Sequence, residues 1–147
     1  GRGVKVLEIN LYDLTIDVLK TREGSSEGSN LWDEILVAEP EVEKEALQEL
    51  LQNVLDIKGH LIPEIGEQLA QSDYDVLFLS GVGEVFPYIR SHNVLNNLQS
   101  TAKDKPTVMF FPGEYRHSLE QGASLELFGL LHDDKYYRAF NIFDIQA

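Results

Sequence analysis

The stretch DVLFLSGVGEVFPYIRSHNVLNNLQ, residues 75–99, decides the fold. Its apolar run VLFL is continuous, which is typical of a strand buried on both faces within a parallel sheet. Gly81 and Gly83 permit a tight turn after that strand. Pro87 suits the first position of a helix, which we expect to run to about Leu98. The stretch therefore predicts a central strand that leads into a helix.

This predicted helix has one polar face. At about 100° per residue, Arg90, Asn93 and Asn97 share a stripe, and His92 and Asn96 lie beside it. Asparagine is a poor helix former, so three asparagines within five positions weaken the helix unless their amides form hydrogen bonds. We expect these side chains to belong to a polar network or to contact a partner protein. An exposed face capped by asparagines is the alternative.

The flanking segments predict alternating strands and helices. Residues 4–9 predict a strand nearer the sheet edge, and Asn10 is suited to cap the helix that follows it. Amphipathic patterns predict helices starting at Pro40 and near Leu61, with Gly59 between them. Together they predict an α/β fold, a single domain over residues 1–147 with a mainly parallel sheet flanked by helices, in a P-loop- or Rossmann-like topology.

The remaining segments complete this plan. Residues 22–30, REGSSEGSN, predict a mobile surface loop, and Trp32 begins a short apolar turn. Residues 107–111 predict a second buried strand, and 114–122 an exposed polar loop. Segment 125–130 is either a strand or a short helix. Residues 139–145 predict the last strand.

Composition limits the function. The 147-residue chain has 12 Lys and Arg against 25 Asp and Glu, a formal charge of −13, which opposes binding to nucleic acid or to an anionic membrane. The absence of cysteine excludes disulfides, Cys-ligated metals and a cysteine nucleophile. No apolar run approaches the length of a membrane span. We expect a cytoplasmic protein.

No intact chemical motif is present. The turn GVGEVFP lacks the third glycine of a dinucleotide fingerprint because Phe86 stands there, no G-K-[ST] follows, and Glu84 would repel a phosphate. The four histidines are scattered without metal-ligand spacing, and Ser80 does not lie in a nucleophile elbow. We expect no enzyme activity, no cofactor and no metal. Any ligand is expected at the carboxyl ends of the buried strands.

Three ordered segments, SGVGEVFPYIRSHNVLNNLQ, PTVMFFPGEY and SLELFGLLHDDKYYRAFNI, resemble the BrxB family of bacterial BREX phage-exclusion systems. The opening VKVLEINLYDLTIDVLK also resembles the start of the family, and the likeness is weakest over residues 23–67. Family members usually carry further chain before this first strand, which suggests an N-terminal truncation here.

The resemblance implies a non-catalytic adaptor of a BREX defence system that binds other BREX proteins, PglZ above all. A degenerate nucleotide- or phosphate-binding domain with a regulatory role is the alternative, and a hydrolase using an Asp133–Asp134 turn is a third. The resemblance implies contact or polar-network roles, without catalysis, for motif positions with exposed-type side chains. These are Arg90, His92, Asn96, Asn97, Tyr115, Asp133, Asp134, Tyr137 and Arg138.

Overall fold

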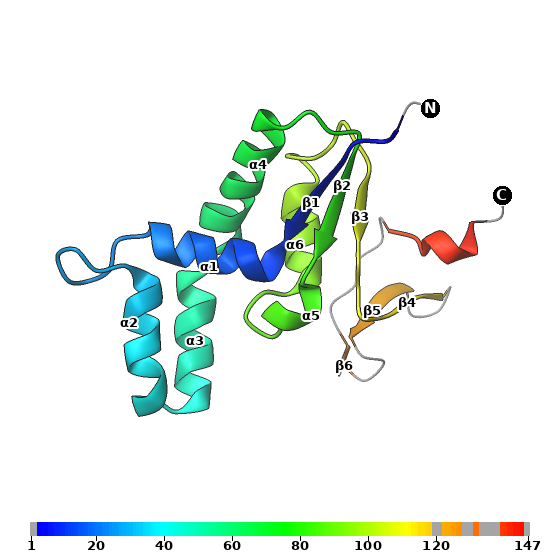
Figure 1. The fold of residues 1–147 in the computed structure, drawn as a ribbon. Helices are drawn as coiled ribbons and strands as arrows, with labels where there is room; N and C mark the ends of the chain where they lie inside the picture. Colours follow the sequence, from blue (N-terminus) through cyan, green and yellow to red (C-terminus); the bar gives the residue numbers. More distant parts are fainter. Residues whose placement is uncertain (1–2, 119–121, 128–130, 133–138, 146–147) are drawn as a thin grey trace.

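The computed structural model describes residues 3–118, 122–127, 131–132 and 139–145 (Figure 1). Its centre is a three-stranded parallel sheet in the order β1-β2-β3, formed by Val6–Asn10, Val76–Ser80 and Thr107–Met109. Each residue of β1 pairs in sequence with one of β2, and β3 pairs with the middle of β2. The predicted central position of β2 and edge position of β1 are confirmed.

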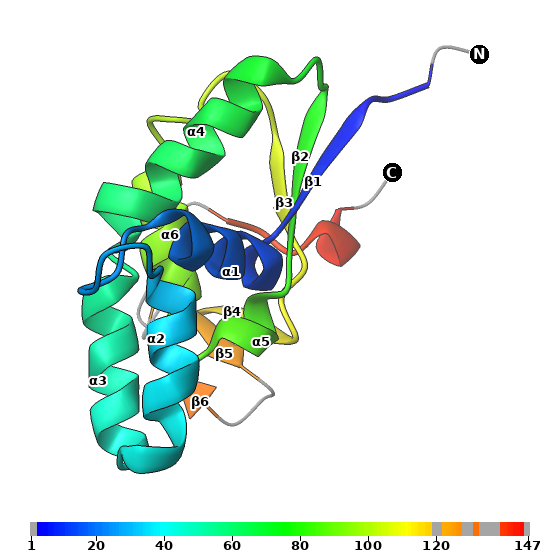
Figure 2. The same ribbon diagram turned by 60° about the vertical axis from the view of Figure 1, so that its left-hand side comes forward.

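Helices cover one face of this sheet. Helices α1 (Leu11–Thr21), α4 (Ile62–Gln71) and α6 (Ser91–Leu98) all lie on the same side of the strands, whereas the 3-10 helix η3 (Ile142–Asp144), near the C-terminus, lies on the other (Figures 1 and 2). Leu77 and Leu79 of β2 face the helices and are fully buried. Their neighbours Val76 and Phe78 are only half-buried.

The second face of the sheet is partly open. Val6 and Phe110 remain 48% and 51% exposed, and the rings of Phe78 and Phe110 meet edge to face with centroids 5.1 Å apart. The prediction that β2 is buried on both faces is therefore wrong, because a continuous apolar run also suits a strand with one buried and one half-covered side.

The hydrophobic core lies between the sheet and the helices. Leu11, Leu14 and Val18 stand at i, i+3 and i+7 and line the inner face of α1. Asn10 caps α1 as predicted, since its Oδ1 accepts hydrogen bonds from the backbone amides of Tyr12 at 2.9 Å and Asp13 at 3.2 Å. The largest fully buried side chains are Leu11, Leu19, Leu61, Ile65, Leu77, Leu79, Ile89 and Val94.

Two helices joined by a tight turn form a hairpin that projects from the body (Figures 1 and 2). They are α2 (Leu31–Ala38) and α3 (Lys44–Val54), with the 3-10 turn η1 (Glu39–Glu41) between them. The expected apolar turn at Trp32 is therefore a full helix, which Asn30 caps by accepting from the amide of Asp33 at 2.9 Å. Pro40 lies in η1 and not at the start of a long helix.

The helix boundaries around two glycine and proline positions also differ from the prediction. Gly59 lies inside a π-helical turn, η2 (Ile57–Leu61), that runs directly into α4. After β2 comes a short helix, α5 (Val82–Val85). The helix predicted from Pro87 begins instead at Ser91, and the Phe86–Pro87 peptide is cis. Helix α5 ends at Phe86 because a residue that precedes proline disfavours helical backbone angles.

A second, antiparallel sheet follows β3. It consists of β4 (Gly113–Ser118), β5 (Gly122–Leu127) and β6 (Leu131–His132). The predicted polar loop over 114–122 is thus mostly strand, because β4 pairs along its whole length with β5. The predicted strand over 139–145 is wrong as well, since its centre is η3 (Ile142–Asp144), capped by Asn141. The α/β class is confirmed.

Candidate functional site

Helix α6 carries the polar side chains that the sequence singles out. Asn93 and Asn96 are exposed, and the Nδ2 of half-buried Asn97 donates to the backbone oxygen of Asn93 at 2.7 Å. Arg90 precedes the helix, with extended backbone angles of φ −99° and ψ 132°. His92 is buried, with 8% of its surface exposed. The helix thus presents two asparagines to the surface, and not a face of five polar residues.

The other predicted contact residues lie on different elements. Tyr115 is half-buried in β4 and pairs with Leu125 of β5, in the antiparallel sheet. Four of the candidates fall outside the described residues: Asp133, Asp134, Tyr137 and Arg138. Among the described candidates, the structure therefore brings together only those at the start of α6 and within it. The contact roles of all ten predicted positions stay predictions.

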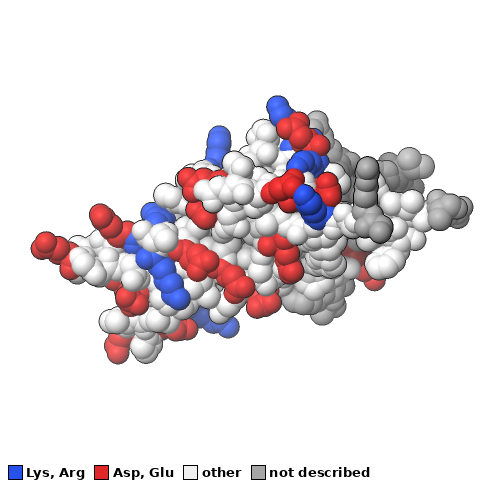
Figure 3. All heavy atoms as spheres, turned by 45° about the horizontal axis from the view of Figure 1, so that its top comes forward, with Lys and Arg blue, Asp and Glu red and all other residues white. Residues whose placement is uncertain are grey.

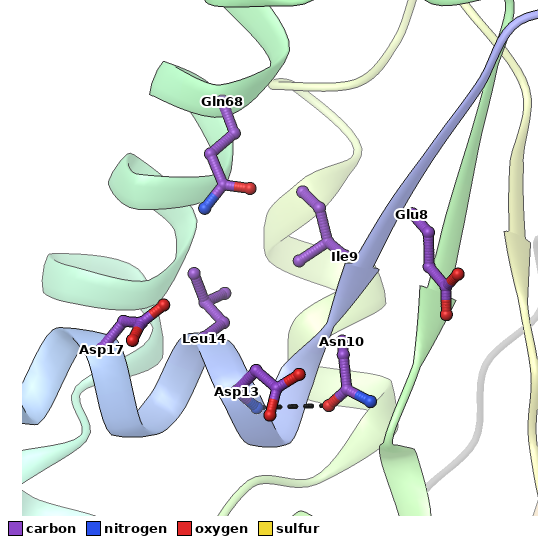
Figure 4. A pocket seen from close by; sticks show the side chains of 7 residues that line it. All are labelled: Glu8, Ile9, Asn10, Asp13, Leu14, Asp17 and Gln68. Atoms are coloured by element: carbon purple, nitrogen blue, oxygen red, sulfur yellow. Dashed lines mark hydrogen bonds between the residues drawn. The ribbon is translucent and has the colours of Figure 1, made fainter.

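A polar hollow of about 390 Å³ lies beside the carboxyl end of β1 (Figure 4). Figure 4 shows Gln68 of α4 reaching toward it from above and Asp13 of α1 from below. Sequence reasoning missed this hollow, although Asp13 and Asp17 stand four residues apart on one helix face directly after a strand. Its lining consists of Glu8, Ile9, Asn10, Asp13, Leu14, Asp17 and Gln68.

The chemistry of this hollow disfavours a phosphate ligand. Three carboxylates line it, and they would repel an anion. The first amides of α1, which a phosphate would use, already donate to Oδ1 of Asn10. Oε1 of Glu8 accepts a hydrogen bond from Oγ of Ser80 at 2.8 Å. The hollow therefore suits a cationic or hydrogen-bond-donating group better than a nucleotide.

The described ranges contain neither a cluster of metal-ligand side chains nor a helix that could cross a membrane. Within residues 3–118, 122–127, 131–132 and 139–145, no group of three or more His, Cys, Asp or Glu side chains could hold a metal ion. In the same part of the chain, every helix is too short or too polar to cross a bilayer.

A second polar cluster surrounds Glu34 of α2. Its carboxylate accepts from Oγ of Ser29 at 2.6 Å, from Oγ of Ser25 at 3.0 Å, and from the backbone amides of Ser25 and Ser26. These bonds, that from the Ser29 hydroxyl foremost, lower the pKa of Glu34 below its ordinary value. The cluster ties the loop of residues 22–30 to the start of α2. The loop lies at the surface as predicted, and its mobility stays a prediction.

We expect Ser29→Ala to raise the pKa of Glu34 toward its ordinary value, because the variant removes the strongest bond to the carboxylate. A lowered folded-state pKa stabilises the fold above the unfolded pKa, and that stabilisation is lost as the pH falls through the folded pKa. The variant should therefore show a weaker loss of stability on acidification. Carbon-detected NMR titration of Glu34 measures the shift, with exposed Ser100→Ala as control. An unchanged Glu34 titration in Ser29→Ala would contradict the assignment.

Comparison with known proteins identifies the family. A family model described as BREX protein BrxB matches residues 7–142, nearly the whole chain. The chain belongs to the BrxB family. A BREX protein BrxB of Bacillus cereus (strain H3081.97) is 54% identical over 70 residues, which are 48% of this chain and 34% of that protein. A BREX protein BrxB of Escherichia coli O9:H4 (strain HS) is 27% identical over 134 residues, which are 91% of this chain and 60% of that protein.

Membership of the BrxB family confirms the resemblance drawn from the three ordered segments. The chain spans about a third of the B. cereus relative and three fifths of the E. coli relative. No solved structure is significantly similar to the chain. The arrangement described above, with helices on one face of a parallel sheet and a projecting helical hairpin, is that of one BrxB family member over the described part of residues 7–142.

Proposed function

We propose that this chain is a component of a BREX anti-phage defence system, in which it acts as a non-catalytic adaptor that binds other BREX proteins, PglZ first among them. The observation that carries the proposal is the match of the BrxB family model to residues 7–142. Two relatives bear the name BREX protein BrxB, which associates the family with that system.

The surface of the chain is consistent with an adaptor. Several large apolar side chains remain exposed, among them Val6 and Phe110 on the open sheet face and Phe143 of η3, which is 90% exposed. Exposed apolar groups of this kind suit contact with another protein. Acidic side chains predominate on the face shown in Figure 3, which favours a partner with basic groups over nucleic acid.

Helix α6 supplies a contact surface for this adaptor role. Asn93 and Asn96 are exposed and stand three residues apart, so their amides reach outward from neighbouring positions on one helix face. Each amide offers donors and an acceptor, which suits hydrogen bonds to the backbone or the side chains of a partner. Contact with a partner explains why α6 carries these asparagines despite their low helix propensity.

The test is co-expression of the tagged full chain with PglZ and the other proteins of its own BREX system. We expect PglZ to co-purify and to remain with the chain through size-exclusion chromatography. The double variant Asn93→Ala/Asn96→Ala should bind PglZ at least tenfold more weakly. Alanine is the better helix former, so helix loss could not explain such a decrease.

Exposed Gln71→Ala, at the end of α4, is the matched control and should bind PglZ as the unchanged chain does. Absence of a stable complex with every BREX protein would refute the adaptor role. A complex that the asparagine variant leaves intact would instead move the contact away from α6.

A further inference from the structure

The projecting hairpin of residues 31–54, which we call the acidic hairpin, has an unusual surface. It contains seven Asp or Glu side chains and a single basic one, Lys44. No residue of α3 is buried, although its apolar positions recur at helical spacing. The hairpin is thus strongly negative and also amphipathic, and it extends away from the sheet (Figures 1 and 2).

The outer face of α2 combines acidic and apolar groups in a small area. Asp33, Glu34, Val37 and Ala38 stand at i, i+1, i+4 and i+5, which places them on one face of the helix. Together with Ser25 they line a hollow of about 340 Å³. Successive turns of α2 thus present two carboxylates and then two apolar side chains.

Val37 is the feature of this face that folding does not explain. Its side chain is 76% exposed, so it contributes little to the core. Valine is also a weaker helix former than the charged or alanine residues that commonly occupy exposed helix positions. Neither packing nor helix propensity accounts for a valine here, whereas contact with a partner would.

The carboxylates beside Val37 are held in place. The amide Nδ2 of Asn30 donates to Oδ2 of Asp33 at 2.8 Å, and Glu34 accepts bonds from the serine loop. Asp33 is exposed and Glu34 is half-buried. Carboxylates that are positioned in this way attract Lys and Arg side chains, whose methylene stems can cover a neighbouring apolar group. This face therefore complements a surface that is both apolar and basic.

We propose that the outer face of α2, centred on Val37 and Ala38 and bordered by Asp33 and Glu34, docks an amphipathic helix of a partner protein whose apolar stripe is flanked by Lys or Arg. Helix-in-groove recognition uses this combination of apolar anchors and bordering charges. A second copy of the chain is a poorer occupant, because its own formal charge of −13 opposes self-association.

The proposal goes beyond the adaptor role, since it specifies a surface and the chemistry of its partner without requiring a BREX protein. The test measures fluorescence anisotropy of a labelled 18-residue amphipathic peptide with a leucine stripe bordered by lysines, titrated with the full chain. Two matched peptides replace the lysines by glutamates or the leucines by serines. We expect saturable binding of the first peptide and at least tenfold weaker binding of the other two.

Variants of the chain then locate the peptide. Val37→Ser should weaken binding of the lysine–leucine peptide at least tenfold, whereas Val4→Ser should change it less than twofold. Val4 is a suitable control because it is 69% exposed and precedes β1, whose N-terminal end lies far from the hairpin in Figures 1 and 2. Asp33→Asn should weaken binding and reduce its dependence on salt, relative to Asp104→Asn, which changes an exposed carboxylate in the segment before β3.

Each other outcome overturns the proposal. Absence of saturable binding, equal binding of all three peptides, or equal affinity of the Val37→Ser and Val4→Ser variants would exclude this docking surface. A dimer in light scattering that Val37→Ser dissociates would assign the face to a second copy instead. The peptide is synthetic and contains no BREX protein, so the peptide experiment and the PglZ experiment can fail separately. Failure of PglZ to bind would not contradict the docking surface on α2, and failure of the peptide to bind would not contradict the adaptor role.

Discussion

Leu79→Ala is expected to lower the free energy of unfolding by about 3 kcal/mol, because deletion of a fully buried leucine loses transfer free energy and leaves a cavity. Leu79 lies in the central strand β2, is completely buried, and faces the helices that cover one side of the sheet. β2 pairs with both β1 and β3, so neither neighbouring strand can move inward without breaking ladder hydrogen bonds. The cavity should therefore collapse only partly.

Urea denaturation followed by circular dichroism measures this effect. Leu50→Ala is the matched control, since Leu50 of α3 is 40% exposed and alanine is a good helix former. The control should change the free energy of unfolding by less than about 0.5 kcal/mol. Equal effects of the two substitutions would contradict the burial pattern of β2.

A comparison of Val76→Ala with Leu79→Ala tests the one-sided sheet. Val76 points to the half-covered face, so its truncation should cost about 1 kcal/mol or less. Sequence could not predict this asymmetry. An apolar run specifies that a strand avoids water, but not whether helices or other segments lie over each face, and that depends on long-range topology.

The parts of the fold that sequence could predict depend on local signals. Asn10 caps α1 because its side chain meets two amides within three residues, and the apolar positions of α1 follow one helical period. The same signal at Asn30, with Asp33 three residues later, was present and would have predicted α2. Helix boundaries were predicted wrongly where a proline or glycine lies inside a turn of helix, as Pro40 does in η1 and Gly59 in η2.

Predictions over β4 and η3 failed for a different reason. The segment GEYRHS has no continuous apolar run, and it becomes a strand through pairing with β5 from Gly113 to Ser118. Such pairing is tertiary information, because strand propensity depends on the neighbouring strand. Near the C-terminus, Asn141 caps a 3-10 turn by accepting from the amide of Phe143 at 3.1 Å, and this local bond prevails over the β-propensity of the apolar residues.

The candidate site was predicted only in part for similar reasons. The polar character of α6 is evident from its asparagines, but Arg90 lies before the helix and His92 is buried within the domain. Although α6 begins at Ser91 and not at Pro87, the positions of Asn93 and Asn97 relative to each other on the helix are unchanged. The later start does remove Arg90 from the helix, and the packing of α6 buries His92. The acidic hollow beside β1 depends on Gln68 of α4, about 60 residues from Glu8 in sequence, and no local pattern connects the two.

Gly81→Ala is expected to lower the free energy of unfolding by about 2 to 3 kcal/mol, combining a left-handed backbone penalty with damage to a helix cap. Gly81 follows β2 and has a φ of +72°, a backbone angle that residues other than glycine rarely adopt. An added Cβ would collide with Oδ1 of Asn10 and lie 3.0 Å from its Cγ and 3.1 Å from the backbone nitrogen of Tyr12. That oxygen caps α1, so the alanine must displace the cap.

Gly28→Ala separates the two contributions to this loss. Gly28 has a similar φ of +80°, but an added Cβ there meets no atom within 4 Å. It should therefore cost only the backbone penalty, about 1 kcal/mol. Chemical denaturation of both variants measures the difference, and the amide shifts of Tyr12 and Asp13 report the cap directly. Equal losses, with those amides unchanged in Gly81→Ala, would show that the turn after β2 does not support the start of α1. A greater loss at Gly81, with shifted amides, would establish that the glycine is required because β2 and α1 approach each other there.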